Sequence, residues 1–449
     1  MVFYGVTVAR WETIENVLVV TLSLATYAVA PLPQQSSRDS REMSAAVVER
    51  LLEQAGDRSV PAEQRQAIWS RLAEAEGPLP FDSLAVLKSD VRSSWLPDYV
   101  RCLGRTSIEA VPLLEKYLSS RADFVRAEAV YAVAQLGGSG GVDLALGILR
   151  NTKEENMVRV AALRGLSAAG SPFARVEAAR RLKTAEGTLL LEAVATMAKR
   201  PSQGDIPYLI QLVERKPNSR AAGEAVLILQ KLTGYRIGRD ARTWTYWMRR
   251  YKAERKPFWR ETGEGAVDSE TLSYLGIPIL GDRVAFVLDS SGSMATPMQE
   301  QTKKTRGEFA VNALNDILPR LPNTALFSLT FFEANVHSLS SVMVPRVTQE
   351  LRSAALWLKM RQFAGGTNLF GGLDRALEFE GVEEIILLSD GAPSAGDWRT
   401  PNQILSRIRR LNRWRRVRIS AIGIGVGSSE RTFLSQLARE NQGDIQLHH

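Results

Sequence analysis

The stretch that decides the fold is Arg283–Met294, which reads RVAFVLDSSGSM. Its five consecutive apolar residues, 284–288, are typical of a strand that is buried on both faces of a parallel sheet. Asp289, Ser291 and Ser293 follow at two-residue spacing in a loop that contains a glycine. In open α/β sheets, ligands bind at the carboxyl ends of the strands. One carboxylate and two hydroxyls can converge there on a small hard cation, because such cations prefer oxygen ligands.

Two later stretches add oxygen-bearing side chains. Residues 363–373 read FAGGTNLFGGL and present Thr367 on a Gly-rich loop. Residues 384–391 read EIILLSDG, a second buried-strand pattern that leads into Asp390. Because Asp289 and Asp390 follow two different strands, they can be neighbours only at the carboxyl edge of the sheet. Two carboxylates placed close together repel each other unless a cation or a proton lies between them.

With these residues in place, the region resembles a von Willebrand factor type A (VWA) domain with a metal-ion-dependent adhesion site. The signature of that family is Asp-x-Ser-x-Ser, then a Thr, then an Asp at the end of a later strand. Five positions match it in order: Asp289, Ser291, Ser293, Thr367 and Asp390. The resemblance implies a bound Mg²⁺, or Mn²⁺ or Ca²⁺ in its place. It also implies that the three hydroxyls bind the ion directly, that the two carboxylates bind it directly or through water, and that an Asp or Glu of a partner protein fills the open position.

The rest of the C-terminal region, residues 281–449, alternates strands with helices. Strands are predicted near 284–288, 325–332, 336–344, 384–389, 417–424 and 444–448, and helices near 300–318, 348–361, 370–379, 401–412 and 429–440. This alternation predicts an α/β fold with a doubly wound, mostly parallel sheet and helices on both faces. The VWA fold, which is Rossmann-like, has the same order of elements.

Residues 44–255 have a helical pattern with an internal repeat. The segment FVRAEAVYAVAQLG (124–137) aligns with MVRVAALRGLSAAG (157–170), and weaker copies fall at 190–200 and 220–234. Each copy follows another amphipathic segment. Paired helices at a period of about 30–35 residues predict an all-α solenoid, which resembles HEAT-type repeats. Such an array is expected to offer a second interaction surface.

The end of this helical region is rich in aromatic residues and arginine. Trp244, Trp247, Met248 and Tyr251 share one face of a predicted helix. They could form a patch for an anionic polymer. Alternatively, the helix closes the last repeat and packs its tryptophans inward, which is the interpretation we favour. Residues 256–280 lack periodicity and are predicted to connect the two domains.

The N-terminus carries a candidate export signal. Residues 17–30 read VLVVTLSLATYAVA, which holds no charge and is too short for an ordinary transmembrane helix. It ends in an Ala-x-Ala pattern, so residues 1–30 resemble a signal peptide or an uncleaved membrane anchor. A short buried helix is the alternative. Residues 31–43 are polar and rich in Pro and Ser, as in a linker. We therefore expect an extracytoplasmic bacterial protein that is periplasmic, envelope-associated or secreted, with the cytoplasm as the alternative.

A second charged feature is a run of seven arginines within residues 407–418. It could bind nucleic acid or an anionic lipid surface, or it could be the solvated face of a helix, which we favour. Nucleic acid is not expected as a partner, whereas membrane or envelope association stays open. The net charge of +8 favours anionic surfaces in general without identifying one.

Composition and motifs argue against catalysis. The single cysteine, Cys102, excludes an internal disulfide framework and a multi-Cys zinc site. The sequence has only three histidines and contains neither a G-x-S-x-G motif nor a P-loop. We therefore predict a non-enzymatic protein for metal-dependent protein–protein binding. Two alternatives are an intracellular accessory protein of an ATPase or a nucleic-acid machine, and a scaffold in which the metal only stabilises the fold.

Overall fold

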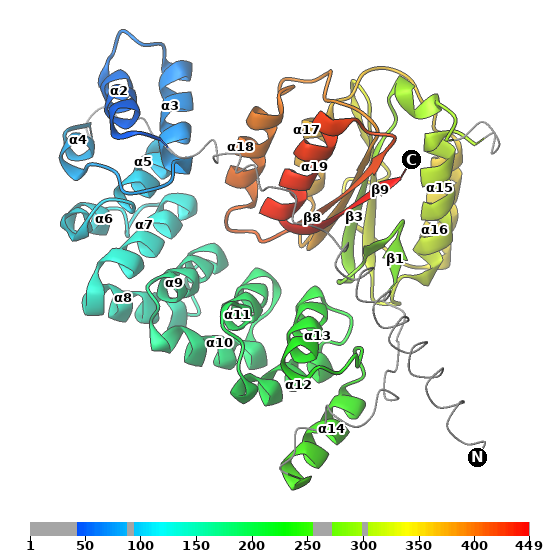
Figure 1. Cartoon of the computed structure of the whole chain (residues 1–449), viewed down its shortest axis with the longest axis horizontal. Helices are drawn as coiled ribbons and strands as arrows, with labels where there is room; N and C mark the ends of the chain where they lie inside the picture. The colour runs from blue at the N-terminus through cyan, green and yellow to red at the C-terminus, as the bar shows by residue number, and fades with distance from the viewer. Residues whose placement is uncertain (1–42, 88–93, 255–271, 299–303, 449) are drawn as a thin grey trace, which may run out of the picture.

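The computed structural model describes residues 43–87, 94–254, 272–298 and 304–448. A helical N-terminal region forms a curved row, and a C-terminal region with a mixed sheet lies against it (Figure 1). The predicted export signal (1–30), all but the last residue of the predicted linker (31–43) and most of the predicted connector (256–280) lie outside the described residues.

The N-terminal region consists of short helices. Its α-helices are α2 (Ala45–Gly56), α3 (Ala62–Glu74), α4 (Phe81–Val86), α5 (Leu96–Leu103), α6 (Val111–Glu115), α7 (Asp123–Leu136), α8 (Gly138–Arg150), α9 (Asn156–Ala168), α10 (Pro172–Thr184), α11 (Gly187–Lys199), α12 (Ile206–Arg215), α13 (Arg220–Thr233) and α14 (Ala241–Glu254). The helical prediction for this part of the chain is therefore confirmed.

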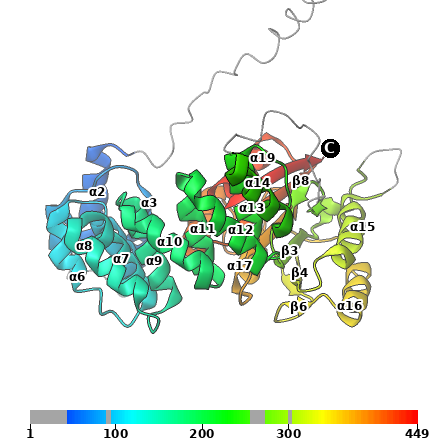
Figure 2. The same cartoon turned by 90° about the horizontal axis from the view of Figure 1, so that it is seen from below.

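The four copies of the sequence repeat correspond to α7, α9, α11 and α13. Each of these helices packs against the next in one row, while α8, α10 and α12 each pack against the helix that follows them. The row is close-packed because small residues face each other. A Cβ atom on Gly165 of α9 would lie 2.7 Å from the Cβ of Ala134 in α7. Figure 2 shows these helices side by side along the molecule.

Helix α14 packs against α12 at the end of the helical region, with its two tryptophans turned inward. Trp244 is fully buried, and Trp247 is 7% exposed. The two rings meet edge to face, with their centroids 6.1 Å apart, and Trp247 also stacks on Tyr251. Burial of the tryptophan pair confirms that this helix packs its aromatic residues inward.

The C-terminal region is built on a seven-stranded sheet of order β5-β4-β3-β7-β8-β9, with β6 paired to β4. Its strands are β3 (Arg283–Asp289), β4 (Leu326–Phe332), β5 (Val336–Ser338), β6 (Val344–Pro345), β7 (Glu384–Ser389), β8 (Arg418–Ile424) and β9 (Gln442–His448). The four pairings β4–β3, β3–β7, β7–β8 and β8–β9 are parallel. Strands β5 and β6 both run antiparallel to β4. The predicted mostly parallel sheet is therefore confirmed.

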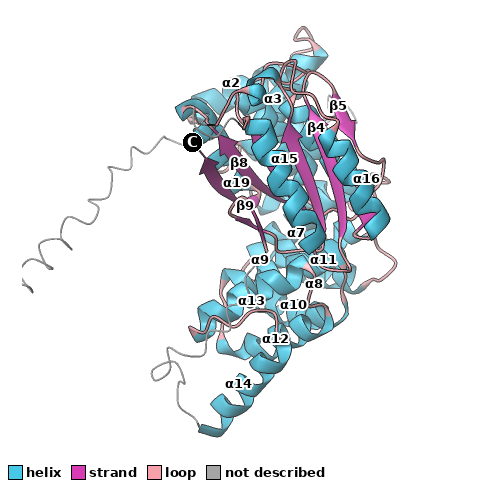
Figure 3. Ribbon diagram, turned by 90° about the vertical axis from the view of Figure 1, so that its right-hand side faces the viewer, coloured by secondary structure: helices cyan, strands magenta, loops and turns pink. Residues whose placement is uncertain are grey.

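Helices cover both faces of this sheet. They are α15 (Arg306–Ile317), α16 (Thr348–Lys359), α17 (Leu369–Glu378), α18 (Pro401–Asn412) and α19 (Ser428–Glu440). Alternate residues of β3 supply the two cores. Phe286 packs in the core with α15 and α16, and Val287 packs in the core with α17, α18 and α19. Figure 3 shows α15 and α16 on the side of the sheet that is turned toward the viewer.

The structure differs from the sequence prediction at several elements. The helix predicted near 300–318 begins at Arg306. The strand predicted at 336–344 is divided into β5 and β6 by a serine-rich segment. The last strand begins at Gln442 rather than near 444. The predicted connector contains a hairpin of β1 (Ser273–Tyr274) and β2 (Ile277–Pro278). Its two turn residues both have positive φ, as in a type I′ turn. The buried Tyr274 hydroxyl donates to the Ala310 carbonyl at 3.0 Å, so this hairpin belongs to the α/β core.

Residues 407–418, which we name the arginine segment, lie at the contact between the two regions. Arg409 pairs with Glu74 of α3 at 2.6 Å, and Arg410 lies 3.4 Å from Asp98 of α5. Three further members pair with carboxylates of α7, α11 and β7, namely Arg413 with Glu128, Arg416 with Glu192 and Arg418 with Glu384. Side-chain exposure of these five arginines ranges from 4% to 28%. Neither a nucleic-acid surface nor a solvated helix face describes this segment, so both interpretations of it were wrong.

The helical row presents alternating charges to this segment. Arg101, Glu128, Arg164, Glu192 and Arg220 come one each from α5, α7, α9, α11 and α13. Arg101 shares Glu128 with the arginine segment, and Arg164 shares Glu192 with it. In the middle of the contact, Trp414 is 2% exposed and packs in the core of the helical region. The two regions are therefore held together by a buried aromatic anchor and by shared ion pairs.

Candidate metal centre

The two predicted carboxylates lie at the carboxyl ends of neighbouring strands. Strand β3 pairs in parallel with β7, with Leu288 opposite Leu388. Asp289 is the last residue of β3, and Asp390 directly follows β7. Both strands are buried along nearly their whole length, because helices cover both faces of the sheet. The apolar runs that form these strands therefore place both carboxylates at one edge of the sheet.

Hydrogen bonds connect four of the five predicted residues. The Ser291 amide donates to Asp289 Oδ1 at 2.8 Å. The hydroxyls of Ser291 and Ser293 lie 3.1 Å apart, and Ser293 Oγ donates to Asp390 Oδ1 at 2.7 Å. The hydroxyls and carboxylates therefore form one continuous polar cluster across the loops that follow β3 and β7.

Thr367 lies on the loop that precedes α17, and backbone hydrogen bonds fix that loop to its neighbours. The Ala364 amide donates to the Ser290 carbonyl at 2.9 Å, and the Gly292 amide donates to the Gly365 carbonyl at 3.1 Å. The Thr367 amide donates to Ser394 Oγ at 3.0 Å, and Thr367 is only 5% exposed. The Gly-rich loop is thus held between the other two loops of the site.

Two residues that the sequence reasoning missed, Ser389 and Arg306, touch this cluster, and a third, Arg361, touches the adjacent Ser290. Ser389 Oγ donates to Asp289 Oδ2 at 2.7 Å. Ser389 directly precedes Asp390 in the sequence, and this position could have been used to predict that its hydroxyl lies at the site. Arg361 Nη2 donates to Ser290 Oγ at 3.0 Å. Arg306 Nη1 pairs with Asp390 Oδ2 at 2.8 Å, across 84 positions of sequence, and no local pattern predicts that contact.

Arg306 is positioned by the start of α15. It is the first residue of that helix, and Thr305 and Glu308 form a capping box around it. Its guanidinium lies against Gly425, where a Cβ atom would come within 2.3 Å of it. Arg306 therefore supplies a positive charge to Asp390 from within the chain.

The electrostatics of the site favour a cation. Burial, against the opposing hydrogen bonds from Ser291 and Ser389 and with a smaller contribution from the nearby Asp390, raises the pKa of Asp289 to about 6. Asp289 is fully buried and Asp390 is 6% exposed, so their negative charges are poorly solvated. A divalent cation between them would relieve both the repulsion and the desolvation.

The donor set fits a hard divalent ion. Among the described residues, no group of three or more His, Cys, Asp or Glu side chains could hold a metal. A site here would therefore combine two carboxylates with hydroxyls, an all-oxygen set that suits Mg²⁺, Mn²⁺ or Ca²⁺. Asp289, Ser291, Ser293 and Asp390 bring such oxygens together at one edge of the sheet, and Thr367 lies on the neighbouring loop.

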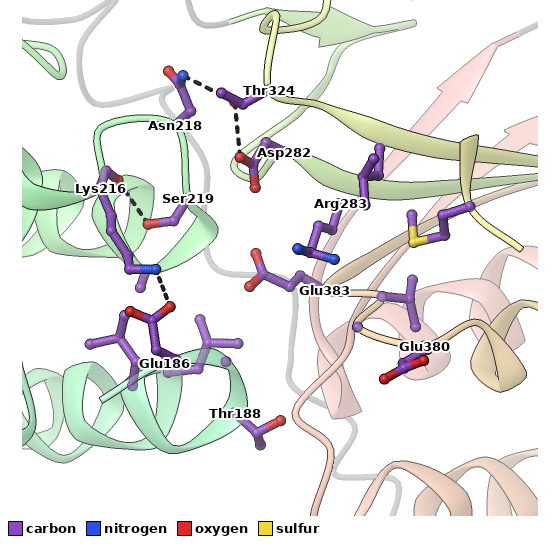
Figure 4. A pocket seen from close by; sticks show the side chains of 18 of the residues that line it. Glu186, Thr188, Lys216, Asn218, Ser219, Asp282, Arg283, Thr324, Glu380 and Glu383 are labelled. Atoms are coloured by element: carbon purple, nitrogen blue, oxygen red, sulfur yellow. Dashed lines mark hydrogen bonds and ion pairs between the residues drawn. The ribbon is translucent and has the colours of Figure 1, made fainter. Parts of the chain in front are cut away.

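A cleft of about 960 Å³ lies at the opposite end of the sheet, between the two regions (Figure 4). Asp282 precedes β3 and Thr324 precedes β4, and Asn218 of the helical region donates to Thr324 Oγ1 at 3.2 Å. Burial raises the pKa of Glu383 in this cleft to about 7. The cleft is thus separated from the predicted metal residues by the length of the strands.

Residues 282–447 match the family model of the von Willebrand factor type A domain. This part of the chain is a VWA domain. Inter-alpha-trypsin inhibitor heavy chain H1 of Sus scrofa is 32% identical over 180 residues, 37% of this chain and 19% of that protein. The heavy chain H1 of Mesocricetus auratus is 29% identical over 177 residues, 36% of this chain and 18% of that protein. The chain thus spans less than a fifth of the length of these relatives.

Among solved structures, a von Willebrand factor type A protein from Catenulispora acidiphila is similar at 20% identity with a TM-score of 0.31. The match covers 38% of this chain and 40% of that one.

In the part of the chain that the structure describes, no helix combines the length and the apolarity needed to cross a bilayer.

Proposed function

We propose that this chain is a non-enzymatic protein that binds another protein through a divalent cation, with Mg²⁺ as the first candidate. Its VWA domain would hold the ion at the carboxyl edge of the sheet. The ion would supply a bridge to an Asp or Glu side chain of the partner. The residues assigned to it are Asp289, Ser291, Ser293, Thr367 and Asp390.

The observation that carries this proposal is the continuous cluster of hydroxyls and carboxylates across β3 and β7. Ser293 already reaches Asp390 at 2.7 Å, and Ser389 orients Asp289 at the same distance. Neutral hydroxyls add coordinating oxygens without adding negative charge. Two carboxylates neutralise a divalent ion while leaving it able to accept one more anionic ligand.

The residues around the cluster have distinct roles in this proposal. Ser389 holds Asp289 in place through its hydroxyl, and Ser394 holds the backbone of Thr367. Arg306 offsets part of the charge of Asp390. Because the loops are tied to one another by backbone hydrogen bonds, the donors need little rearrangement to bind.

The helical region acts as a support in this proposal, and its repeats resemble HEAT repeats. One row of its helices, α7, α9, α11 and α13, contacts the VWA domain through the charges described above. A second partner would therefore have to bind a helical surface that the VWA domain leaves open. We place the protein outside the cytoplasm of a bacterium, on the strength of the uncharged segment 17–30 and its Ala-x-Ala end.

A capture experiment tests the proposed binding. The full chain is immobilised and exposed to an envelope extract of the source cells, in Mg²⁺ or in EDTA. We expect proteins that are retained only in Mg²⁺, lost with Asp390→Asn, and kept with Asp397→Asn, a change at an exposed carboxylate of a neighbouring loop. Retention that is identical in EDTA and with Asp390→Asn would overturn the proposal.

A further inference from the structure

A second cavity lies within the contact between the helical region and the VWA domain. Its volume is about 460 Å³, which is in the range of small-molecule sites. We name the carboxyl edge of the sheet, where Asp289 and Asp390 lie, the metal edge, and this cavity is separate from it. One side of the cavity is formed by α3, α5, α9 and α11. The other side is formed by α18, the arginine segment and the end of α19.

Cationic side chains outnumber carboxylates on the walls of this cavity. Six cationic side chains line it, namely Arg101, Arg164, Lys199, Arg409, Arg413 and Arg416. Only three carboxylates do so, namely Glu74, Glu192 and Glu440. The buried Glu128 pairs with two of these arginines. Even when Glu128 is counted, an excess of two positive charges remains.

The ion pairs in the wall leave donor groups unused. A single oxygen of Glu192 accepts from Arg164 at 2.6 Å and from Arg416 at 3.3 Å. The Nε–H groups of Arg101 and Arg416 are buried without a hydrogen-bond partner. Their side chains are only 10% and 12% exposed. Buried donors without a partner are costly, so the carboxylates of this wall do not satisfy all of its guanidinium groups.

Lys199 adds a charge that no carboxylate of the wall neutralises directly. Its ammonium donates to Ser167 Oγ at 2.9 Å. Burial lowers its pKa, and repulsion from Arg164 and Arg416 lowers it further, although Glu192 opposes the shift. The arginine that faces it is also held in an uncommon backbone conformation. Arg416 has a φ of 54°, and its Nη2 donates to Gln442 Oε1 at 2.6 Å. Such backbones are maintained where the surroundings fix a side chain in place.

We propose that this cavity binds a phosphate-type oxyanion between the two regions. A phosphate offers several acceptor oxygens and two negative charges, which match the excess of two positive charges on the walls and the guanidinium and ammonium groups that line them. The anion is either free inorganic phosphate or the phosphate group of a larger metabolite. Its binding strengthens the contact between the helical region and the VWA domain, because both sides of the cavity supply donors.

Thermal melting of the full chain tests this proposal. Inorganic phosphate is titrated against chloride at constant ionic strength, with EDTA present so that the metal edge cannot capture phosphate. A saturable rise of the melting midpoint is expected for phosphate and not for chloride. The affinity is then measured by calorimetry, with AMP as the second ligand. Tighter binding of AMP identifies a phosphate on a larger metabolite, and equal or weaker binding of AMP identifies free phosphate.

Variants at Lys199 test whether phosphate binds specifically in this cavity or stabilises the chain through a general effect of salt. Lys199→Gln is expected to weaken phosphate binding about tenfold, and Lys199→Glu to abolish it, because each removes a charged donor. Lys199 is exposed on the last residue of α11, so both variants should fold. Lys153→Gln, at an exposed lysine outside the cavity, is the matched control. Equal midpoints in phosphate and chloride, or unchanged affinity in Lys199→Gln, would overturn the proposal.

Discussion

The VWA domain contains two dense charge clusters, the arginine segment and the carboxylates at the metal edge, and they differ in how they are paired. The arginine segment is paired with carboxylates of the helical region and lies inside the molecule. At the metal edge, the chain supplies one ion pair, from Arg306 to Asp390, and Asp289 has hydroxyl and amide donors as its partners. Where carboxylates elsewhere in the chain pair with a charge cluster, as they do with the arginine segment, the pairing forms an internal contact. Where two carboxylates lie together with few cationic partners, as at the metal edge, the cluster is a candidate site for a bound cation.

The largest effect is expected from breaking the internal contact. Glu128 is fully buried between Arg101 and Arg413. Burial alone would raise its pKa, yet these two arginines hold that pKa below its usual value. Glu128→Gln should lower the free energy of unfolding by about 3–5 kcal/mol, because two buried guanidiniums lose their counter-charge. Urea unfolding of the full chain measures this loss.

The matched control for this prediction is Glu154→Gln. Glu154 pairs with Arg126 at 2.9 Å, and its side chain is 22% exposed. Solvent weakens such a pair, so the expected loss is below about 1 kcal/mol. If both variants unfold at the same urea concentration, the buried pairing of the arginine segment does not stabilise the contact.

A smaller, pH-dependent effect is expected at the cleft between the two regions (Figure 4). Burial raises the pKa of Glu383 from 4.5 to about 7. The stabilisation from its protonated form is complete below about pH 4.5 and is lost as the pH rises through about 7. Glu383→Gln should therefore be more stable than the unmodified chain at pH 8, by about 1–3 kcal/mol, and equally stable at pH 4.5.

Melting midpoints between pH 4.5 and pH 8 measure this difference. Glu380→Gln is the control, because Glu380 lines the same cleft but is exposed. A constant difference between Glu383→Gln and the unmodified chain at all pH values would show that Glu383 does not titrate in this range.

The third effect concerns the ion pair between Arg306 and Asp390 at the metal edge. Arg306 competes with a bound cation for Asp390, with Nη1 lying 2.8 Å from Oδ2. Arg306→Gln should tighten Mg²⁺ binding on the order of tenfold, because a neighbouring positive charge is removed. Calorimetry measures the affinity, and Arg352→Gln on the exposed side of α16 is the control. Weaker Mg²⁺ binding in Arg306→Gln would mean that Arg306 supports the site instead of competing with it.

The sequence predicted that Asp289 and Asp390 lie at one edge of the sheet, but it did not predict the contacts of the arginine segment, and the difference has a physical reason. Asp289, Ser291 and Ser293 follow a buried strand, so local patterning places them at the strand end. Asp390 follows a second such strand, and the parallel sheet brings the two ends together. The helical repeat was visible because α7 and α9 share the pattern Val-Arg-x-x-Ala, at residues 125–129 and 158–162.

The partners of the arginine segment could not be predicted in this way. Glu128 lies 285 residues from Arg413, and Glu74 lies 335 residues from Arg409. No periodicity connects positions so distant, and pairing between two separately folded regions depends on how their surfaces dock. The β1–β2 hairpin was missed for a related reason. The hairpin is too short to show a strand pattern. The burial of Tyr274 depends on its contact with Ala310 of α15, which the sequence does not reveal.

The central claim is that the carboxyl edge of the VWA domain binds a divalent cation. The most direct test is calorimetric titration of the full chain with Mg²⁺, compared with Asp289→Asn. We predict one binding event in the unmodified chain and none in the variant, with a cooperative melting transition for both proteins in EDTA. Equal Mg²⁺ affinity in the two proteins, or no binding to the unmodified chain at millimolar Mg²⁺, would contradict the assignment.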